Sequence, residues 1–306
     1  MARLLTVSAA QLGPIGRHET RDAVVRRLLR LMEDAKDSGA DLVVYPELAL
    51  TSFFPRWIIE DPAERARFYE TAMPSAETKP LFEAAARLGI GFFLGYAEQA
   101  VEGWYNSSVL VDKTGAIIGK YRKVHLPGTS DPVPGAVQQL ERRYFDPGNL
   151  GFPVFRAFSG IVGMCLCNDR RWPETYRVMA LQGVELVLLG YNTPAHLPAT
   201  PQHDRFRMFH NHLPMQAGAY QNTTWVVGVA KAGLEEGEEL IGGSCIIAPT
   251  GEIVAQAKTL GDELVTARID LDEVLACRAV NFDFALYRRP DQYRLITERA
   301  GAVPPE

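Results

Sequence analysis

One stretch decides the fold of this chain: Val162-Gly163-Met164-Cys165-Leu166-Cys167-Asn168-Asp169-Arg170-Arg171-Trp172-Pro173-Glu174. The apolar run that ends at Leu166 predicts a buried strand. Pro173 suits the first position of a helix. The negative charge of Glu174 would then stabilise the positive N-terminal end of that helix. Cys167 is therefore expected between the strand and the helix, facing helix-terminal amides. Such amides lower the pKa of a thiol and favour the attacking thiolate.

Two roles fit Cys167 on this evidence. A lone cysteine is most often a small buried hydrophobic residue, and a nucleophile is the alternative. The polar residues that follow, Asn168 to Arg171, favour the nucleophile, because the end of a strand inside a core does not need two arginines.

Composition narrows the class of protein. With 47% hydrophobic and 23% charged residues, the 306-residue chain is globular and has room for one large or two ordinary domains. Its net charge of −5, with both signs interspersed, argues against nucleic acid or an anionic membrane as a partner. Four cysteines make no disulfide framework, which fits a reducing cytoplasm. The opening residues resemble no signal peptide and no apolar run approaches ~18 residues, so we expect a soluble cytoplasmic protein.

Strand and helix patterns alternate along the chain. Apolar runs predict strands at residues 4–11, 41–45, 90–96, 184–189, 224–230 and 244–248. Apolar residues at helical spacing predict helices at 20–38 and 78–88, and a largely helical stretch at 202–221 that is interrupted at Pro214. Paired strands are expected at 104–111 and 116–123, joined by a turn that contains Gly115.

One hairpin pattern occurs in each half of the chain. The run from Val109 to Ile118 matches the pattern of the run from Cys245 to Val254, and β-α units precede both. Helices mixed with hairpins indicate mixed sheets covered by helices. Two related halves would stack their sheets face to face, with the helices outside. Because no low-complexity linker separates them, we expect one domain over residues 1–280.

The last segment, residues 281–306, differs from the rest of the chain. Its first part is aromatic and basic, with Phe282, Phe284, Arg288 and Arg289, and it shows no clear periodicity. An aromatic-rich terminal segment rarely stays in water. We therefore expect this tail to pack on a partner subunit of a homodimer or homotetramer.

Three segments resemble the nitrilase superfamily of carbon-nitrogen hydrolases. They are Val43-Val44-Tyr45-Pro46-Glu47-Leu48, Gly119-Lys120-Tyr121-Arg122-Lys123-Val124-His125-Leu126-Pro127, and the stretch around Cys167. The resemblance covers nearly the whole chain and implies an α/β fold, an α-β-β-α four-layer sandwich, which agrees with the architecture predicted from the patterns. The most similar family is N-carbamoyl-D-amino-acid hydrolase (D-carbamoylase), which is also resembled by residues 47–51, 53–57, 142–145, 167–174, 190–194 and 201–204.

The residues that carry the resemblance suit hydrolysis of an amide or ureido bond. Such carbons are poor electrophiles, so the reaction needs a strong nucleophile, a proton shuttle and a stabilised oxyanion. Cys167 would be the nucleophile. Glu47 ends an apolar strand, where partial desolvation would raise the pKa of its carboxyl toward the range of an acid-base catalyst. A strand-terminal surface carboxylate is the alternative for Glu47.

A lysine beside the oxyanion is the third expected catalytic group. Lys123 ends the strand 116–123 and fits the family's catalytic lysine, and a solvated strand-end lysine is the alternative. Lys120 is a rival in the same strand, but the spacing before His-Leu-Pro selects Lys123. The backbone N–H of Asn168 is the second expected oxyanion donor. The resemblance gives Glu141 the role of orienting the lysine, and an ordinary loop carboxylate is its alternative.

The resemblance also implies a set of substrate-binding residues: His125, Asn168, Arg170, Arg171, Asn192 and Thr193. An arginine in such a set can hold a carboxylate through two hydrogen bonds, so a small carboxylate-bearing substrate is expected. Structural ion pairing or a subunit contact is the alternative for Arg170 and Arg171. Two departures from the family concern the substrate rather than the reaction class. Gln139 stands where the family carries a histidine, and the loop 128–137 lacks the family's charged and aromatic residues.

Other kinds of site find little support in the sequence. His210-Asn211-His212 lacks a third ligand at metal spacing, and no glycine-rich phosphate loop follows a strand. We therefore expect no metal and no cofactor. The sequence predicts a cysteine hydrolase that cleaves the carbamoyl C–N bond of an N-carbamoyl-D-amino acid and yields the D-amino acid, CO2 and ammonia. The alternatives are a superfamily amidase acting on a β-ureido acid, an aliphatic amide or a nitrile, a non-catalytic scaffold of the same fold, and a thiol redox protein built on Cys165 and Cys167.

Overall fold

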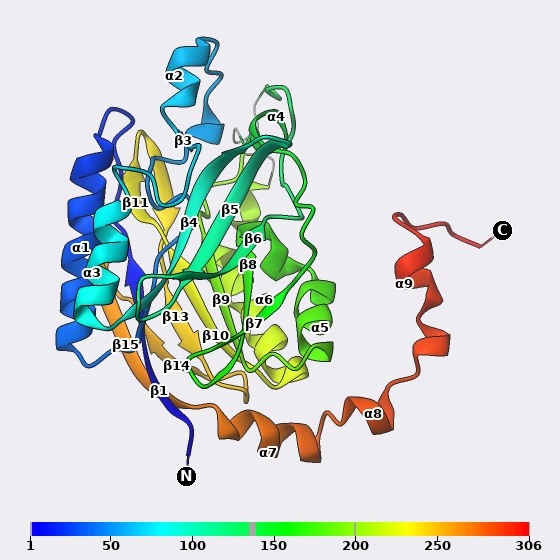
Figure 1. Cartoon of the computed structure of the whole chain (residues 1–306). Coiled ribbons are helices and arrows are strands. Elements are labelled where there is room, and N and C mark those ends of the chain that lie inside the picture. The colour runs from blue at the N-terminus through cyan, green and yellow to red at the C-terminus, as the bar shows by residue number, and fades with distance from the viewer. Residues whose placement is uncertain (1, 135–138, 199, 306) are drawn as a thin grey trace.

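Two β-sheets packed face to face form the centre of the molecule (Figure 1). The computed structural model describes residues 2–134, 139–198 and 200–305. Within these residues the first sheet has seven strands, in the order β15-β1-β2-β4-β5-β6 with β3 beside β4. Their bounds are β1 Leu4–Gln11, β2 Leu42–Val44, β3 Tyr69–Glu70, β4 Gly91–Ala100, β5 Gly103–Val111, β6 Ile117–Arg122 and β15 Glu263–Asp270.

The second sheet has six described strands, in the order β14-β13-β10-β9-β8-β7. Neighbouring strands β8, β9 and β10 run parallel. Because parallel strands end at the same edge of a sheet, the residues that follow β8 and β9 lie side by side. The bounds are β7 Val154–Ala157, β8 Gly160–Leu166, β9 Leu186–Tyr191, β10 Trp225–Ala230, β13 Cys245–Ile247 and β14 Ile253–Gln256, and a separate ribbon pairs β11 Ala232–Glu235 with β12 Glu238–Ile241.

The repeated hairpin lies once in each sheet. β5 pairs antiparallel with β6 in the first sheet, and β13 pairs antiparallel with β14 in the second. Each pairing shifts its register at the same point of the pattern, between Leu110 and Val111 in one and between Ile246 and Ile247 in the other. Such an irregularity bends and twists a strand locally. The two halves therefore repeat a structural detail as well as a sequence pattern.

Helices cover the outer faces of both sheets (Figure 1). α1 Arg21–Asp37 and α3 Lys79–Leu88 lie on the first sheet, and α5 Pro173–Leu181 and α6 Arg207–Asn222 lie on the second. α1 buries the apolar stripe that its spacing predicted, including Val24, Leu28 and Met32. The arrangement is the expected α-β-β-α sandwich. Short elements join these layers: α2 Pro62–Ala66, α4 Glu141–Tyr144, η1 Phe54–Arg56, η2 Cys167–Arg171 and η3 Pro201–Phe206.

α6 continues through Pro214, so the predicted interruption there is wrong. A proline inside a helix removes one hydrogen bond. Met215 and Ala219, which follow it, are fully buried in the same apolar cluster as the second sheet. This packing offsets the missing bond, because tertiary packing supplies most of the stability of a helix in a protein.

The largest apolar cluster lies between the sheets. Val7 and Phe93 of the first sheet are fully buried in one cluster with Met164 and Leu188 of the second. Fully burying one such side chain stabilises the fold by about 1.5–3 kcal/mol. The two sheets are therefore held together by apolar contact, which fixes the distance between residues at their edges.

The chain leaves this body after α7 Asp272–Val280 and extends to one side of it, through α8 Phe284–Tyr287, η4 Pro290–Gln292 and α9 Arg294–Glu298 (Figure 1). At the start of the tail the ring of Phe282 lies 5.1 Å from that of Tyr220 in α6. Farther on, Tyr287 and Ile296 are 61% and 59% exposed. Packing of this tail on a partner subunit stays a prediction. None of the helices in the described part of the chain has the length and apolar composition that crossing a membrane requires.

Candidate active site

Cys167 stands at the carboxyl end of β8, as the first residue of η2. Its φ is 47°, in the left-handed region that costs a residue with a side chain about 1–2 kcal/mol. The residue is 6% exposed, and its Sγ lies 3.8 Å from the carbonyl oxygen of Asn192, which follows β9. Cys167 also lines a cavity of about 240 Å³. The predicted turn between strand and helix therefore holds the thiol at a small cavity.

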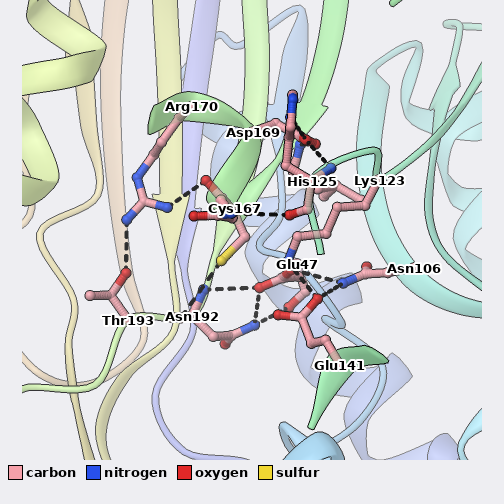
Figure 2. Close-up of polar contacts among 12 residues, drawn as sticks. Glu47, Asn106, Lys123, His125, Glu141, Cys167, Asp169, Arg170, Asn192 and Thr193 are labelled. Atoms are coloured by element: carbon pink, nitrogen blue, oxygen red, sulfur yellow. Dashed lines mark hydrogen bonds and ion pairs between the residues drawn. The ribbon is translucent and has the colours of Figure 1, made fainter. Parts of the chain in front are cut away.

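Glu47 approaches the same point from the first sheet, in the loop after β2 (Figure 2). Its carboxylate is fully buried and accepts four hydrogen bonds. Oε1 accepts from Lys123 Nζ at 2.7 Å and from Asn106 Nδ2 at 2.8 Å. Oε2 accepts from the backbone N–H of Asn192 at 3.1 Å and from its Nδ2 at 2.9 Å. Donors on both oxygens favour the ionised form of the carboxylate.

Two glycines, one from each sheet, enclose the backbone of Glu47. A Cβ placed on Gly190 of β9 would lie 2.2 Å from the Glu47 nitrogen. One placed on Gly95 of β4 would lie 2.8 Å from the Glu47 Cα. Both distances are far below any van der Waals contact, so only glycine allows the two sheets this close approach. The backbone that carries the carboxylate is therefore fixed from both sides.

Lys123 follows β6 and lies between two carboxylates (Figure 2). Its Nζ is 2.7 Å from Glu47 Oε1 and 2.6 Å from Glu141 Oε2, and all three side chains are fully buried. Glu141 is the first residue of α4, so the resemblance placed it next to the lysine correctly in space. Lys120, the rival lysine, pairs instead with Glu98 and has a 38% exposed side chain.

Asn106 of β5 joins this group, and the sequence analysis did not single it out. Its Nδ2 donates to Glu47 Oε1 at 2.8 Å and to Glu141 Oε2 at 3.4 Å. Its backbone carbonyl oxygen accepts a hydrogen bond from the backbone N–H of Lys123 at 2.8 Å. A single asparagine in the middle of a strand pattern gives no signal of such a role, which appears only when β5 and β6 pair.

The buried charges set the protonation states of the site. Desolvation, together with the charge of Glu47, raises the pKa of Glu141 to about 7. These two effects outweigh the charge and the hydrogen bond of Lys123, which lower it. Desolvation acts on Glu47 in the same direction, but Lys123 and the amide donors of Asn192 and Asn106 prevail and lower the pKa of Glu47. Burial disfavours the Lys123 ammonium, yet the charges of Cys167, Glu141 and Glu47 raise the pKa of Lys123 above its ordinary value. Glu47 and Lys123 therefore form an ion pair, and Glu141 gains or loses its proton near neutral pH.

Two expectations about pKa values need correction. Burial, followed by the charge of Glu47, raises the pKa of the Cys167 thiol to about 11, where helix-terminal amides were expected to lower it. The pKa of Glu47 is lowered, where desolvation was expected to raise it. The thiol is therefore neutral at rest. Its Sγ and one oxygen each of Glu47 and Glu141 lie within 4.8 Å of one another, so one bridging water would be enough to pass the thiol proton to Glu47.

The same three side chains, Glu47, Glu141 and Cys167, form the kind of group that can ligate a metal ion. The ammonium of Lys123, however, already bonds to both carboxylates. A cation placed between them would meet this positive charge at close range. The arrangement therefore suits proton transfer better than metal binding.

Arg170 lies on the side of Cys167 away from Glu47 (Figure 2). It is not among the residues that line the cavity. Its guanidinium donates to the carbonyl oxygen of Cys167 at 2.6 Å, to Thr193 Oγ1 at 2.9 Å and to Asn211 Oδ1 at 2.7 Å. It is 1% exposed. The resemblance implied substrate binding for this residue, but its contacts hold the turn that carries the thiol.

Arg171, by contrast, is exposed and lines the cavity. Its guanidinium makes no hydrogen bond or ion pair with any described residue. The neighbouring charge of Arg170 lowers the pKa of Arg171 to about 10. Gln139 also lines this cavity, whereas residues 135–137 of the altered loop lie outside the described residues. The described residues of the wall are Pro127, Gln139, Cys167, Asn168, Arg171, Asn192, Thr193, Pro194, Leu197 and Arg207.

Two residues of the predicted substrate-binding set line the cavity while their polar atoms bind other side chains. Asn192 donates its backbone N–H and its Nδ2 to Glu47. Thr193 accepts a hydrogen bond from Arg170 on its Oγ1. Both residues follow β9, which runs parallel to β8. The sheet therefore places them beside the turn that carries Cys167.

His125 lines an adjoining cavity of about 560 Å³. Its Nδ1 lies 2.8 Å from Asp169 Oδ1, and its ring stacks on Trp172 with 5.0 Å between centroids. Asn168 and Pro127 line both cavities, and Asn168 Nδ2 donates to the carbonyl oxygen of His125 at 3.2 Å. His125 therefore lies beside the cavity of the thiol and not in its wall.

Known proteins resemble this chain over nearly its whole length. The family described as Carbon-nitrogen hydrolase matches residues 6–279. The N-carbamoylputrescine amidase of Solanum lycopersicum is 31% identical, over 99% of this chain and 98% of the relative. The citrullinase of Francisella tularensis is 28% identical, over 88% of this chain and 91% of the relative.

Solved structures share the fold. A carbon-nitrogen hydrolase from Helicobacter pylori G27 matches with a TM-score of 0.84 at 24% identity, over 97% of this chain and 99% of that chain. An amidase from Nesterenkonia sp. matches with a TM-score of 0.71 at 19% identity, over 95% of both chains. The structural likeness shows the sandwich, and the family match and the 31% identity show membership. This chain therefore belongs to the carbon-nitrogen hydrolases of the nitrilase superfamily.

Proposed function

We propose that this carbon-nitrogen hydrolase removes the carbamoyl group of an N-carbamoyl-D-amino acid and releases the D-amino acid, CO2 and ammonia. The observation that carries the proposal is the guanidinium of Arg171, which has no polar partner among the described residues and lines the same cavity as the Cys167 thiol. An arginine can bind a carboxylate through two parallel hydrogen bonds. A molecule with a carboxylate near a ureido group reaches both residues at once.

The curated relatives favour a second candidate. Those in Solanum lycopersicum and Arabidopsis thaliana are named N-carbamoylputrescine amidase. N-carbamoylputrescine carries a cationic amine where an N-carbamoyl amino acid carries a carboxylate. An ammonium ~4 Å from a guanidinium is repelled by about 4 kcal/mol at the effective dielectric near a protein surface, which is roughly a thousandfold in affinity. The charge of Arg171 therefore supports the carboxylate-bearing substrate.

In the proposed reaction, Glu47 accepts the thiol proton as Cys167 Sγ attacks the carbamoyl carbon. Lys123 Nζ and the backbone N–H of Asn168 stabilise the oxyanion. Glu47 returns the proton to the leaving nitrogen, ammonia departs, and a carbamoyl thioester remains on the sulfur. Glu47 then takes a proton from water, whose oxygen attacks the thioester and frees the thiol. The released carbamate loses CO2 without help from the enzyme.

Chirality enters because two groups of the substrate are fixed. The carboxylate is held by Arg171 and the ureido carbon lies against Cys167, so the configuration at Cα decides where the side chain points. The side chain of the D form is directed to the mouth of the cavity, and that of the L form is directed into its wall. Gln139 and Leu197 also line this wall, so the preferred side chain depends on groups outside the catalytic set.

A panel of N-carbamoyl-D- and N-carbamoyl-L-amino acids with several side chains tests the proposal, with ammonia as the readout. We expect faster hydrolysis of the D forms. Arg171→Gln should lower kcat/KM on them by roughly 30- to several-thousand-fold, because losing a desolvated charge-assisted contact costs about 2–5 kcal/mol. Equal rates on both enantiomers would reject the D assignment. Faster hydrolysis of N-carbamoylputrescine than of any ureido acid would select the second candidate.

A further inference from the structure

Arg207 is a residue of the cavity wall that the sequence motifs did not predict. It is the first residue of α6, is 9% exposed and lines the cavity together with Arg171 and Cys167. Its Nε donates to the carbonyl oxygen of Pro194 at 3.0 Å. This bond fixes the guanidinium, and its two terminal nitrogens have no bonded partner in the described part of the chain.

The wall of the cavity carries positive charge and, among its described residues, no carboxylate. Among its described residues Arg171 and Arg207 are cationic and none is acidic. Arg170, behind the wall, donates only to neutral acceptors. Asp204 of the preceding η3 lies outside this wall and pairs with His196 Nδ1, and its charge offsets only part of the effects of burial and Arg170 on the pKa of Arg207. Burial, followed by the charge of Arg170, lowers the pKa of Arg207, which is the effect of a site that favours an incoming anion.

We propose that Arg207 and Arg171 together hold the carboxylate of the substrate, and that Arg170 is a positioning residue for Cys167. The inference rests on the proposed function, because it names the groups that recognise the carboxylate. From the sequence, the adjacent residues Arg170 and Arg171 were expected to bind the substrate. In a 3₁₀-helix such as η2, however, consecutive side chains point about 120° apart. One of these two arginines can therefore face the cavity while the other binds the backbone of Cys167.

Arg171 and Arg207 differ in how far their guanidinium groups are oriented before a ligand binds. Arg171 is exposed and unrestrained, whereas Arg207 is buried and already oriented by Pro194. A guanidinium that is oriented beforehand loses less conformational freedom when a ligand binds. Arg207 should therefore contribute to affinity for the carboxylate in the ground state, and its loss should appear mainly in KM.

The experiment compares N-carbamoyl-D-alanine with its methyl ester, which keeps the ureido group and has no negative charge. Arg207→Gln should lower kcat/KM on the acid by roughly 30- to several-thousand-fold, mainly through KM. On the ester the same variant should differ from the wild type by less than about threefold. Arg207→Lys keeps the charge but loses the planar fork, so it should recover only part of the activity on the acid. This second variant serves if the glutamine variant does not fold.

Two further variants separate the roles. Arg205→Gln, at an exposed arginine two positions earlier in η3, is the matched control and should change neither substrate. Arg170→Lys should lower kcat on the acid and on the ester alike, because it acts through the Cys167 backbone. In the Cys167→Ala background, where nothing is hydrolysed, calorimetry should show weaker binding of N-carbamoyl-D-alanine after Arg207→Gln.

The outcomes distinguish this inference from the proposed function. Equal losses on acid and ester after Arg207→Gln would overturn the inference, because a purely structural role gives that result. No loss after Arg207→Gln, with a selective loss after Arg171→Gln, would also overturn it and leave the proposed function intact. A wild-type enzyme that hydrolyses the ester as well as the acid would reject the carboxylate requirement itself, and with it the proposed function.

Discussion

Replacing Glu47 by glutamine separates the two duties of that side chain, proton transfer and structural pairing. Each carboxylate oxygen accepts two hydrogen bonds, one from Lys123 and Asn106 and the other from two groups of Asn192. Glutamine has one acceptor oxygen, and its NH2 group must face one of these pairs of donors. Two buried donors then each lose a hydrogen bond to this side chain, at about 1–3 kcal/mol each. Glu47→Gln should therefore lower the free energy of unfolding by about 2–6 kcal/mol.

Urea unfolding measures this loss. The protein concentration is kept constant, because assembly would change the apparent stability. Glu83→Gln is the matched control: its side chain is 63% exposed and pairs with Lys79 at 3.2 Å, so its effect should stay within about 0.5 kcal/mol. The loss of the base should also lower kcat by about 10²–10⁴-fold. A Glu47→Gln midpoint equal to that of the wild type would refute the pairing argument, and a kcat within about tenfold would refute the role of Glu47 as base.

Three other predictions concern the thiol, the pH profile and the tail. Cys167→Ala should abolish hydrolysis with the fold intact, and mass spectrometry of the wild type should find a substrate adduct on that thiol only; an active alanine variant would end the proposal. As the pH falls through about 7, Glu141 gains a proton and its charge no longer supports the Lys123 ammonium, so kcat/KM should fall. This fall of kcat/KM at acidic pH should disappear in the Glu141→Gln variant. If the variant shows the same fall with the same midpoint pH, the fall does not come from Glu141. Deleting residues 281–306 should lower the mass seen by light scattering or leave insoluble protein, whereas a full-length chain that is monomeric at micromolar concentration argues against a partner subunit.

Local patterns sufficed to predict the elements around the proposed nucleophile. The apolar run before Cys167 and the proline after it predicted β8 and α5, and the repeated hairpin predicted one related unit in each sheet. These features depend on neighbouring residues only. β15 could not be predicted in the same way, because it pairs with β1 from the opposite end of the chain, Leu4 against Asp270. Nothing in the local pattern of either segment indicates that partner.

The direction of a side chain and the charges around it were beyond the sequence. The pair Arg170 and Arg171 shows two cations but not which of them faces the cavity. Arg207 lies in another element and reaches the site only through the packing of α6. Partial desolvation of Glu47 was predicted, and the side chain is fully buried. The sign of its pKa shift depends on donors from three other strands or loops, so that sign was predicted wrongly. Reading pKa values from sequence fails wherever distant partners decide them.

The proposed catalytic groups come from both sheets, and this has a consequence for folding. Glu47 and Lys123 follow strands of the first sheet, whereas Cys167 and Asn192 follow strands of the second. A refolding chain whose two sheets have formed but have not yet docked has much of the native far-UV circular dichroism and no competent nucleophile. The rate at which hydrolytic activity returns during refolding therefore reports the rate at which the two sheets dock. Far-UV circular dichroism does not detect this late event.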